Sequence, residues 1–263
     1  MTDLNSAQKY FENLVTGPVM VAFSGGADSI LVLKLALHAA QGEFPVYALY
    51  ADTPWMPRRA LKEARDIARE FQIDLNVITI DRPEDIGIEN NPKDRCYRCK
   101  KAIFNAFFAF GNEHGAKLLL EGTQLDDLTK YRPGLKAIAE SGALSPLKEL
   151  GLHKSDVRRL LTELHIKSAN KPSGSCLCTR LPYNCHLTLE GLKRIEEAEA
   201  FLATLELGSV RLRSHGDIAR IEVSADQFEK ALSLRQALIE KIKSLGWKYV
   251  TLDLEGFRSG SMD

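Results

Sequence analysis

The segment Ser24–Ser29 reads Ser-Gly-Gly-Ala-Asp-Ser and directly follows the apolar run 18–23. Its glycines let backbone N–H groups turn toward one anion, and the start of a following helix adds partial positive charge. Its serines supply hydroxyl donors, and a carboxylate beside bound phosphates suits a Mg²⁺ ion. A plain strand-to-helix turn with capping side chains is the alternative. The predicted phosphate ligands are Ser24, Gly25, Gly26, Asp28 and Ser29, with Asp28 also on magnesium.

Five cysteines fall into two groups, the pair Cys96 and Cys99 and the trio Cys176, Cys178 and Cys185. An odd, clustered set argues against a disulfide framework and for a metal site, an iron–sulfur cluster or a reactive thiol. Three thiolates on a 4Fe-4S cluster leave one iron open, and an open iron can hold an extra sulfide. We prefer the trio as cluster ligands. Structural zinc on four of the thiols is one alternative, and a first pair that merely fills apolar space is another.

Arginines near the cysteines and in the last third of the chain have a spacing that suits anion binding. Arg211 and Arg213 alternate, so on a strand both point to one face, and Arg220 and Glu222 do the same. Guanidinium groups pair with carboxylates and phosphates, and Arg180 lies among the cysteines. A solvated sheet edge is the alternative for the first pair, and a structural ion pair is the alternative for the second.

The chain has 263 residues with 35 Lys+Arg and 35 Asp+Glu, so its formal net charge is zero. Proteins that grip long nucleic acid carry a basic excess, so we expect no nucleic-acid partner. No apolar run approaches the roughly 20 residues that span a bilayer, so we expect no membrane segment. The first ten residues contain Asp3 and no apolar stretch, which predicts no signal peptide and a cytoplasmic protein.

Apolar runs alternate with segments of helical periodicity through the first two thirds of the chain. This alternation predicts an α/β fold with a doubly wound parallel sheet. The expected strands are 18–23, 45–50, 75–80 and 117–121, and the expected helices are 4–16, 27–40, 58–71, 97–114 and 154–164. The glycine turn therefore falls between the first strand and the next helix, at the sheet edge where such folds bind ligands.

The stretch 168–186 is rich in Pro, Gly, Ser and Cys and has no periodicity, which predicts a boundary. It would separate a large α/β domain at 1–167 from a small α+β domain at 187–263. In the small domain we expect a helix at 188–205, strands at 210–213, 218–223 and 248–252, and a mostly helical stretch at 225–245.

The string Ser24–Ser29 resembles the PP-loop of the N-type ATP pyrophosphatases, and it lacks the Gly-Lys-Ser/Thr of a Walker A loop. Members of that superfamily cleave ATP between the α and β phosphates and attach AMP to an oxygen of the substrate. The resemblance implies that reaction here, with the loop on the departing pyrophosphate. Asp52 and Thr53, at the end of the second expected strand, are candidate contacts near the adenosine, where Trp55 either stacks or packs.

Further motifs are similar to those of the LarE-type ATP-dependent sulfur transferases and cover nearly the whole chain. They are Glu121-Gly-Thr123, Asp126-Asp127, Tyr131-Arg-Pro-Gly134, Ser145-Pro-Leu147, Lys171-Pro-Ser173, Arg180-Leu-Pro-Tyr183, Arg211-Leu-Arg213, Asp217-Ile-Ala-Arg-Ile-Glu222 and Gly256-Phe-Arg-Ser-Gly260. These enzymes make the nickel-pincer nucleotide cofactor of lactate racemase by converting two carboxylates of a pyridinium mononucleotide to thiocarboxylates. The resemblance implies ATP contacts at Gly122, Thr123 and Asp127 and substrate contacts at Arg180, Arg211, Arg213, Arg220 and Glu222.

Three thiols in one segment resemble the branch of that family whose 4Fe-4S cluster carries the sulfide. The other branch gives up the sulfur of one sacrificial cysteine and turns over once. The implied cofactors are ATP, magnesium and a 4Fe-4S cluster, and the implied catalytic residues are Asp28, Cys176, Cys178 and Cys185. Related tRNA thiolases instead join a pair like Cys96 and Cys99 to one downstream cysteine. The implied partners are a pyridinium mononucleotide and a sulfide donor, and the small domain would bind substrate and form a homo-oligomer.

Three other functions remain open. A tRNA thiolase shares the loop and a cluster, but it needs a basic surface for RNA, which a net charge of zero disfavours. An amide-forming adenylating ligase would not need the cysteines. A non-catalytic nucleotide or metal sensor would not need an intact loop with Asp28.

Overall fold

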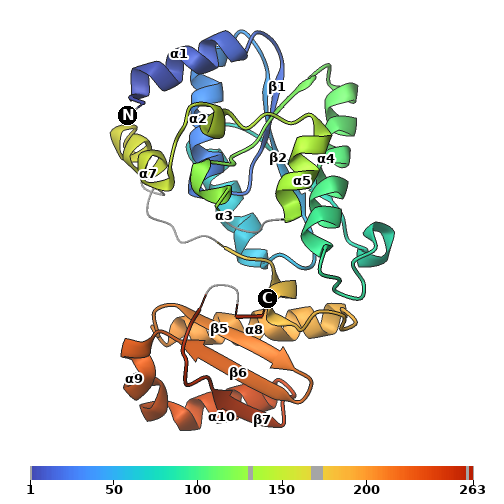
Figure 1. The fold of residues 1–263 in the computed structure, drawn as a ribbon, viewed down its shortest axis with the longest axis vertical. Helices are drawn as coiled ribbons and strands as arrows, with labels where there is room; N and C mark the ends of the chain where they lie inside the picture. The colour runs from blue at the N-terminus through green and yellow to red at the C-terminus, as the bar shows by residue number, and fades with distance from the viewer. Residues whose placement is uncertain (1, 130–132, 167–173, 259–260, 263) are drawn as a thin grey trace. The chain divides into compact units, whose positions relative to one another are not determined.

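The computed structural model describes residues 2–129, 133–166, 174–258 and 261–262, which form two compact units (Figure 1). The first unit comprises Met1–Thr53, Arg58–Ile86 and Asp94–Gly174, and the second comprises Pro54–Pro57, Gly87–Lys93 and Ser175–Asp263. Two short pieces from the first half of the chain therefore pack with the cysteine segment and the C-terminal part. Because sequence patterns carry no sign of such long-range packing, the predicted linear boundaries do not include these pieces.

The first unit is built on a four-stranded sheet in the order β3-β2-β1-β4. Its strands are β1 (Val19–Ala22), β2 (Val46–Asp52), β3 (Leu75–Thr79) and β4 (Leu118–Leu120). All three pairings are parallel, with Val19 opposite Val46 and also opposite Leu118. The α/β fold with a doubly wound parallel sheet is thus confirmed.

Helices cover both faces of this sheet (Figure 1). One side carries α1 (Leu4–Leu14), α2 (Ala27–Ala40), α3 (Arg58–Glu70), the short α6 (Pro146–Glu149) and α7 (Lys154–Glu163). The other side carries α4 (Arg95–Glu113) and α5 (Pro133–Ser141). Phe104 and Phe107 of α4 are buried against that second face and form part of its core.

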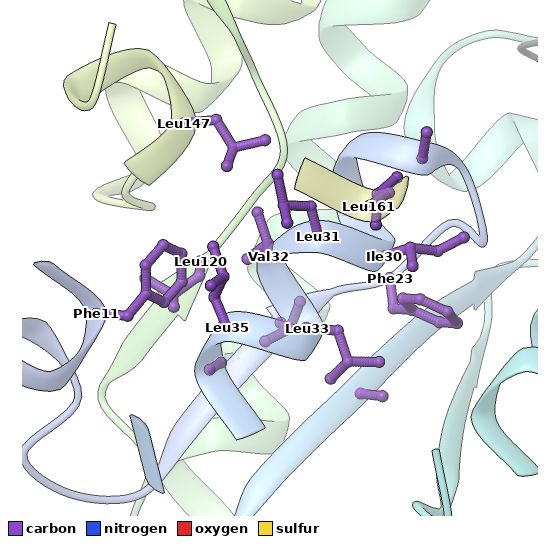
Figure 2. Close-up of a cluster of buried hydrophobic side chains, with 14 of the residues drawn as sticks. Phe11, Phe23, Ile30, Leu31, Val32, Leu33, Leu35, Leu120, Leu147 and Leu161 are labelled. Atoms are coloured by element: carbon purple, nitrogen blue, oxygen red, sulfur yellow. The ribbon is translucent and has the colours of Figure 1, made fainter. Parts of the chain in front are cut away.

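Helix α2 lies at the centre of the larger core (Figure 2). Its Ile30, Leu31, Val32 and Leu33 side chains are all fully buried. A helix that is apolar on every side has to be covered on every side, and here α1, α7 and the sheet do so. This packing fixes the start of α2, and with it the turn that precedes the helix.

The strand order creates a switch point between β1 and β4. The connection after β1 crosses one face of the sheet to β2, whereas α4 crosses the other face before β4. Ligands of doubly wound sheets bind outside the carboxyl ends of the strands at such a point. The turn Ser24–Ser29 follows β1 and Glu121–Thr123 follows β4, so both stand at this edge.

The second unit contains a three-stranded mixed sheet in the order β5-β6-β7. Its strands are β5 (Val210–His215), β6 (Ile218–Val223) and β7 (Tyr249–Leu252), with β5 antiparallel and β7 parallel to β6. Its helices are η4 (Leu177–Arg180), α8 (Leu189–Thr204), η5 (Ala225–Gln227), α9 (Phe228–Ser233) and α10 (Arg235–Ser244). The mostly helical stretch expected at 225–245 is therefore confirmed, and it consists of three consecutive helices.

None of the helices in the described parts of the chain is long and apolar enough to cross a membrane.

Candidate functional site

The turn after β1 has the backbone that an anion-binding loop needs. Gly25 adopts φ +70°, a left-handed conformation that favours glycine, and a Cβ there would approach the Ala64 backbone to 3.3 Å. The Ser29 hydroxyl donates to the Gly26 carbonyl at 2.9 Å and lies 3.2 Å from the Ser24 hydroxyl. The hydroxyl groups of the predicted phosphate ligands Ser24 and Ser29 thus form hydrogen bonds within the loop.

Asp28 stands in the first turn of α2 with its two carboxylate oxygens in different surroundings. Oδ2 accepts a hydrogen bond from Lys154 Nζ at 2.6 Å. Oδ1 is buried and has no hydrogen-bond partner among the residues that the structure describes. A buried carboxylate oxygen without a donor is costly unless another group, such as a cation, binds it. The residues at this position therefore fit a Mg²⁺ ion held through Oδ1.

Lys154 was not identified from sequence, and Asp126 holds it in place. The Lys154 backbone N–H donates to Asp126 Oδ2 at 2.8 Å, and a ring nitrogen of His153 lies 2.7 Å from Asp126 Oδ1. The hydrogen bond to Asp126 raises the pKa of His153 above its ordinary value. Asp127, the predicted ATP contact, instead accepts the Gln124 backbone N–H at 3.3 Å, so Asp126 is the carboxylate that positions Lys154.

The end of β4 packs directly on the phosphate loop. A Cβ at Gly122 would meet Asp28 and Ser29 backbone atoms at 3.0 Å, so only glycine fits this close approach without movement. The buried Glu121 carboxylate accepts from the Thr123 N–H at 3.0 Å and from the Thr123 hydroxyl at 2.8 Å. The predicted residues Gly122 and Thr123 therefore lie beside Asp28. The Ser145 hydroxyl also donates to the Glu121 carboxylate.

The end of β2 supplies a second partnerless polar atom. The Thr53 hydroxyl is buried and has no hydrogen-bond partner among the described residues. Arg58 donates to Asp52 Oδ1 at 2.6 Å and also to the Thr53 carbonyl oxygen. Trp55 belongs to the second unit, is 1% exposed and accepts the Leu177 N–H on its carbonyl oxygen, so it packs rather than offering an open stacking surface.

The cysteine trio belongs to the second unit, with Cys176 capping the short helix η4, Cys178 within it and Cys185 after it. Cys178 is buried, Cys176 and Cys185 are half-buried, and the Cys178 N–H donates to Cys176 Sγ at 3.4 Å. Within the described residues, no three His, Cys, Asp or Glu side chains are gathered as ligands of a single metal ion. A cluster takes each thiolate on a different iron atom, so its ligands stand farther apart than those of one ion. The three thiols therefore fit an iron–sulfur cluster in donor type and in sharing one short segment.

The pair Cys96 and Cys99 lies on α4 in the first unit, with Cys96 exposed and Cys99 half-buried. The two cysteine groups thus lie in different units.

Three parts of the motifs named from sequence, residues 131–132, 171–173 and 259–260, lie outside the described residues.

Arg180 is fully engaged by neighbouring groups. Its Nε and Nη2 donate to the two oxygens of Glu199 at 2.8 and 2.9 Å, and its Nη1 donates to the Ser175 hydroxyl at 2.6 Å. Glu199 Oε1 also accepts the Leu212 N–H at 3.2 Å. Arg180 and Glu199 are both buried, so this pair ties the cysteine helix to α8 and β5. Glu199 carried no motif signal in the sequence.

Glu222 joins two of the predicted arginines on one face of the small sheet. Its Oε2 accepts from Arg213 Nη2 at 2.9 Å, and its Oε1 accepts from Arg220 Nη2 at 3.1 Å. Arg213 also donates to the Thr179 carbonyl at 2.9 Å, a second tie between η4 and β5. Arg211 donates to its neighbour's carbonyl and lies over the Phe257 ring at 5.4 Å. The predicted arginines of this sheet therefore lie close together, and each donates a hydrogen bond to a carboxylate or a carbonyl oxygen of the protein.

His215 follows these arginines on β5. Burial, with the nearby Arg220 charge, lowers the pKa of His215.

The fold defines a doubly wound α/β protein with a second, mixed-sheet unit. No protein-family model matches the chain. The chain is 38% identical over 245 residues to the pyridinium-3,5-bisthiocarboxylic acid mononucleotide synthase of Lactiplantibacillus plantarum, covering 93% of this chain and 88% of the relative. Uncharacterized proteins of Synechocystis and Methanocaldococcus jannaschii are 34% and 32% identical, covering 99% and 97% of this chain and 96% and 95% of the relatives. The chain belongs to the LarE-type family, that of the Lactiplantibacillus synthase.

Proposed function

We propose that the protein is an ATP-dependent, AMP-forming sulfur transferase acting on a pyridinium dicarboxylate mononucleotide. The relative from Lactiplantibacillus is named as the synthase of the bisthiocarboxylic product, which supports the substrate class and the insertion of sulfur. ATP use is carried by one observation. Among the described residues, the buried Asp28 Oδ1 and the buried Thr53 Oγ1 have no hydrogen-bond partner, and Lys154 places a cation on the other oxygen of Asp28.

The first step uses the phosphate loop. A substrate carboxylate oxygen attacks the α-phosphorus of ATP, the bond to the β-phosphate oxygen breaks, and pyrophosphate leaves. Backbone N–H groups at Gly25 and Gly26, with the start of α2, would bind the pyrophosphate. Asp28 would hold Mg²⁺ through Oδ1, while Lys154 would place its charge on the departing phosphates.

The second step exchanges oxygen for sulfur. Sulfide attacks the acyl carbon, and AMP leaves with the former carboxylate oxygen. Cys176, Cys178 and Cys185 would hold a 4Fe-4S cluster, which would supply the sulfide. Exclusion of water favours this outcome, because an acyl-adenylate also reacts with water.

The substrate carries carboxylates and a phosphate, so cationic donors have to bind it. Arg211 and Arg220 are proposed as direct contacts, because both side chains are only half-buried. Arg180, Arg213 and Glu222 are buried and already paired, and we propose that they shape the pocket and the cysteine segment. A sulfide donor and a homo-oligomeric state belong to the same proposal through the family.

The test is the identity of the nucleotide products. Anaerobic protein, the pyridinium substrate, Mg²⁺ and ATP should release AMP and pyrophosphate, and release should stop without the substrate. Asp28→Ala should abolish it, whereas Asp66→Ala on the exposed side of α3 should not. Release of ADP and phosphate instead would overturn the proposal.

A further inference from the structure

Asn91 lies at the centre of the cysteine segment although 87 residues separate it from Cys178. It is fully buried and adopts φ +47°, a left-handed conformation that asparagine tolerates better than other side chains. The loop that carries it, Gly87–Lys93, packs in the second unit. A strained, buried polar residue of this kind persists only where the surrounding structure holds it in place.

The Asn91 side-chain amide contacts several groups of the segment that carries Cys178 and Cys185. Nδ2 lies 2.8 Å from the Pro182 carbonyl oxygen and 3.3 Å from each of the Cys178 and Leu181 carbonyl oxygens. The same nitrogen lies 4.0 Å from Cys185 Sγ. A flipped amide would direct an oxygen at three carbonyl oxygens, so the network fixes the orientation. One side chain therefore reaches the backbone of one cysteine and the sulfur of another.

Backbone contacts reinforce this arrangement. The Asn184 N–H donates to the Asn91 carbonyl at 3.1 Å, and the Leu187 N–H donates to the Glu89 carbonyl at 2.7 Å. The loop therefore frames the segment from Cys178 to Leu187. Asn91 Oδ1 is buried and has no hydrogen-bond partner among the described residues. Such an atom lowers the stability of the fold, so stability alone does not explain an asparagine at this position.

We propose that Asn91 is a positioning residue for the sulfur chemistry, holding Cys178 and Cys185 so that they can serve one iron–sulfur cluster. The inference rests on the proposed function for the cluster, but its geometry stands apart from it. Asparagine is required because its amide donates to several acceptors. Aspartate has the same shape but would press a carboxylate against the same carbonyl oxygens, and glycine keeps the left-handed backbone without the amide.

The variants are Asn91→Asp and Asn91→Gly, with Asn90→Asp as the matched control. Asn90 is the exposed neighbour. Its amide donates to Glu89 and its side-chain oxygen lies near His186, whereas the Asn91 amide contacts the carbonyl groups of Cys178, Leu181 and Pro182. The first measurement is alkylation of each thiol in the cluster-free protein, resolved by peptide mass mapping. Both Asn91 variants should label the buried Cys178 at least tenfold faster, whereas Cys99 in the first unit should label at the control rate.

The second measurement is uptake of iron and sulfide under anaerobic conditions and survival of the cluster against a chelator. Both Asn91 variants should hold less cluster and lose it faster, with the control unchanged. Both tryptophans lie in the second unit, so their fluorescence reports whether that unit is still folded. The contrary result is that Cys176, Cys178 and Cys185 are all labelled faster to the same extent in both variants, and that the tryptophan fluorescence shows both variants unfolding earlier than the wild type. That result would show a purely structural role and overturn the inference.

The two proposals fail in different ways. If the wild-type protein takes up no iron and sulfide, the cluster assignment is wrong while the labelling result still decides the role of Asn91. If the wild type loads normally and both Asn91 variants match it in labelling and cluster lifetime, Asn91 does not position the thiols.

Discussion

Lys154 Nζ lies 2.6 Å from Asp28 Oδ2, although 126 residues separate the two side chains. The pair places the first residue of α7 against the first turn of α2, where the glycine turn opens. Both side chains are about one quarter exposed, so an anion from solution can reach the lysine. Lys154 therefore neutralises Asp28, and under the proposed function it would place the same charge on a phosphate of ATP.

Replacing Lys154 with methionine should weaken ATP binding while leaving the fold intact. Loss of one charged contact to the phosphates corresponds to a rise in the KM for ATP of about 10- to 100-fold, or about 1.4–2.8 kcal/mol. Steady-state AMP release measures it. Lys148→Met is the matched control, since Lys148 is exposed on the neighbouring α6. An unchanged KM for ATP in Lys154→Met would remove Lys154 from the phosphate site.

His153 should make stability depend on pH in one direction. Its hydrogen bond to Asp126 raises its pKa, so the stabilisation is complete below the ordinary histidine pKa of about 6.5 and is lost as pH rises through the raised pKa. The melting temperature of the wild type should therefore exceed that of His153→Gln most at pH 5.5, and the gap should shrink toward pH 8.5. Asp126→Asn should remove the same pH dependence. A gap that widens with pH would contradict the assignment.

The buried pair of Arg180 and Glu199 should dominate the stability of the second unit. Removing one partner strands a buried charge, so Arg180→Met should cost about 3–5 kcal/mol. Lys193→Ala removes one side of the exposed pair with Glu197 and should cost about 0–1 kcal/mol. Urea unfolding followed by tryptophan fluorescence measures both, because both tryptophans belong to this unit. Equal costs for the two variants would show that Arg180 is not a structural anchor.

The two cysteine groups should differ in what their loss does. Changing any one of Cys176, Cys178 or Cys185 to serine should abolish the cluster and repeated turnover with supplied sulfide, because each thiolate would hold a different iron. Changing Cys96 and Cys99 should leave both, as measured by iron content and product per protein. Loss of the cluster on removing that pair, with Cys178→Ser and Cys185→Ser still loaded, would favour the tRNA-thiolase ligand set. A single turnover and one essential cysteine would favour a sacrificial thiol.

Local patterns predicted most of the fold. The apolar run before the glycine turn becomes β1, and the apolar segment after it becomes α2, because strand and helix periodicity depend on near neighbours. The mostly helical stretch expected at 225–245 is present, divided into three consecutive helices. The chain breaks at Leu234, where φ −91° and ψ 8° depart from helical geometry, and no glycine or proline marks that break in the sequence.

The candidate site was predictable only where one short segment carries it. The motif Ser24–Ser29 is contiguous, and its glycines and carboxylate are the residue types that indicate a phosphate and Mg²⁺ site. Lys154 and Asn91 gain their roles from contacts with residues 126 and 87 positions away, which no local pattern records. The contact between Asp126 and the start of α7 likewise depends on which of two adjacent carboxylates faces that helix, and only the folded backbone determines that.

The fate of a substrate oxygen tests the adenylation mechanism most directly. The substrate carboxylates are labelled with ¹⁸O, and the wild-type protein is given ATP, Mg²⁺ and sulfide under anaerobic conditions. If the carboxylate oxygen attacks the α-phosphorus and leaves with AMP, each thiocarboxylate formed should release one AMP that carries one ¹⁸O, with unlabelled pyrophosphate. Thiocarboxylate formed together with unlabelled AMP, or with ¹⁸O in phosphate, would contradict adenylation of the carboxylate.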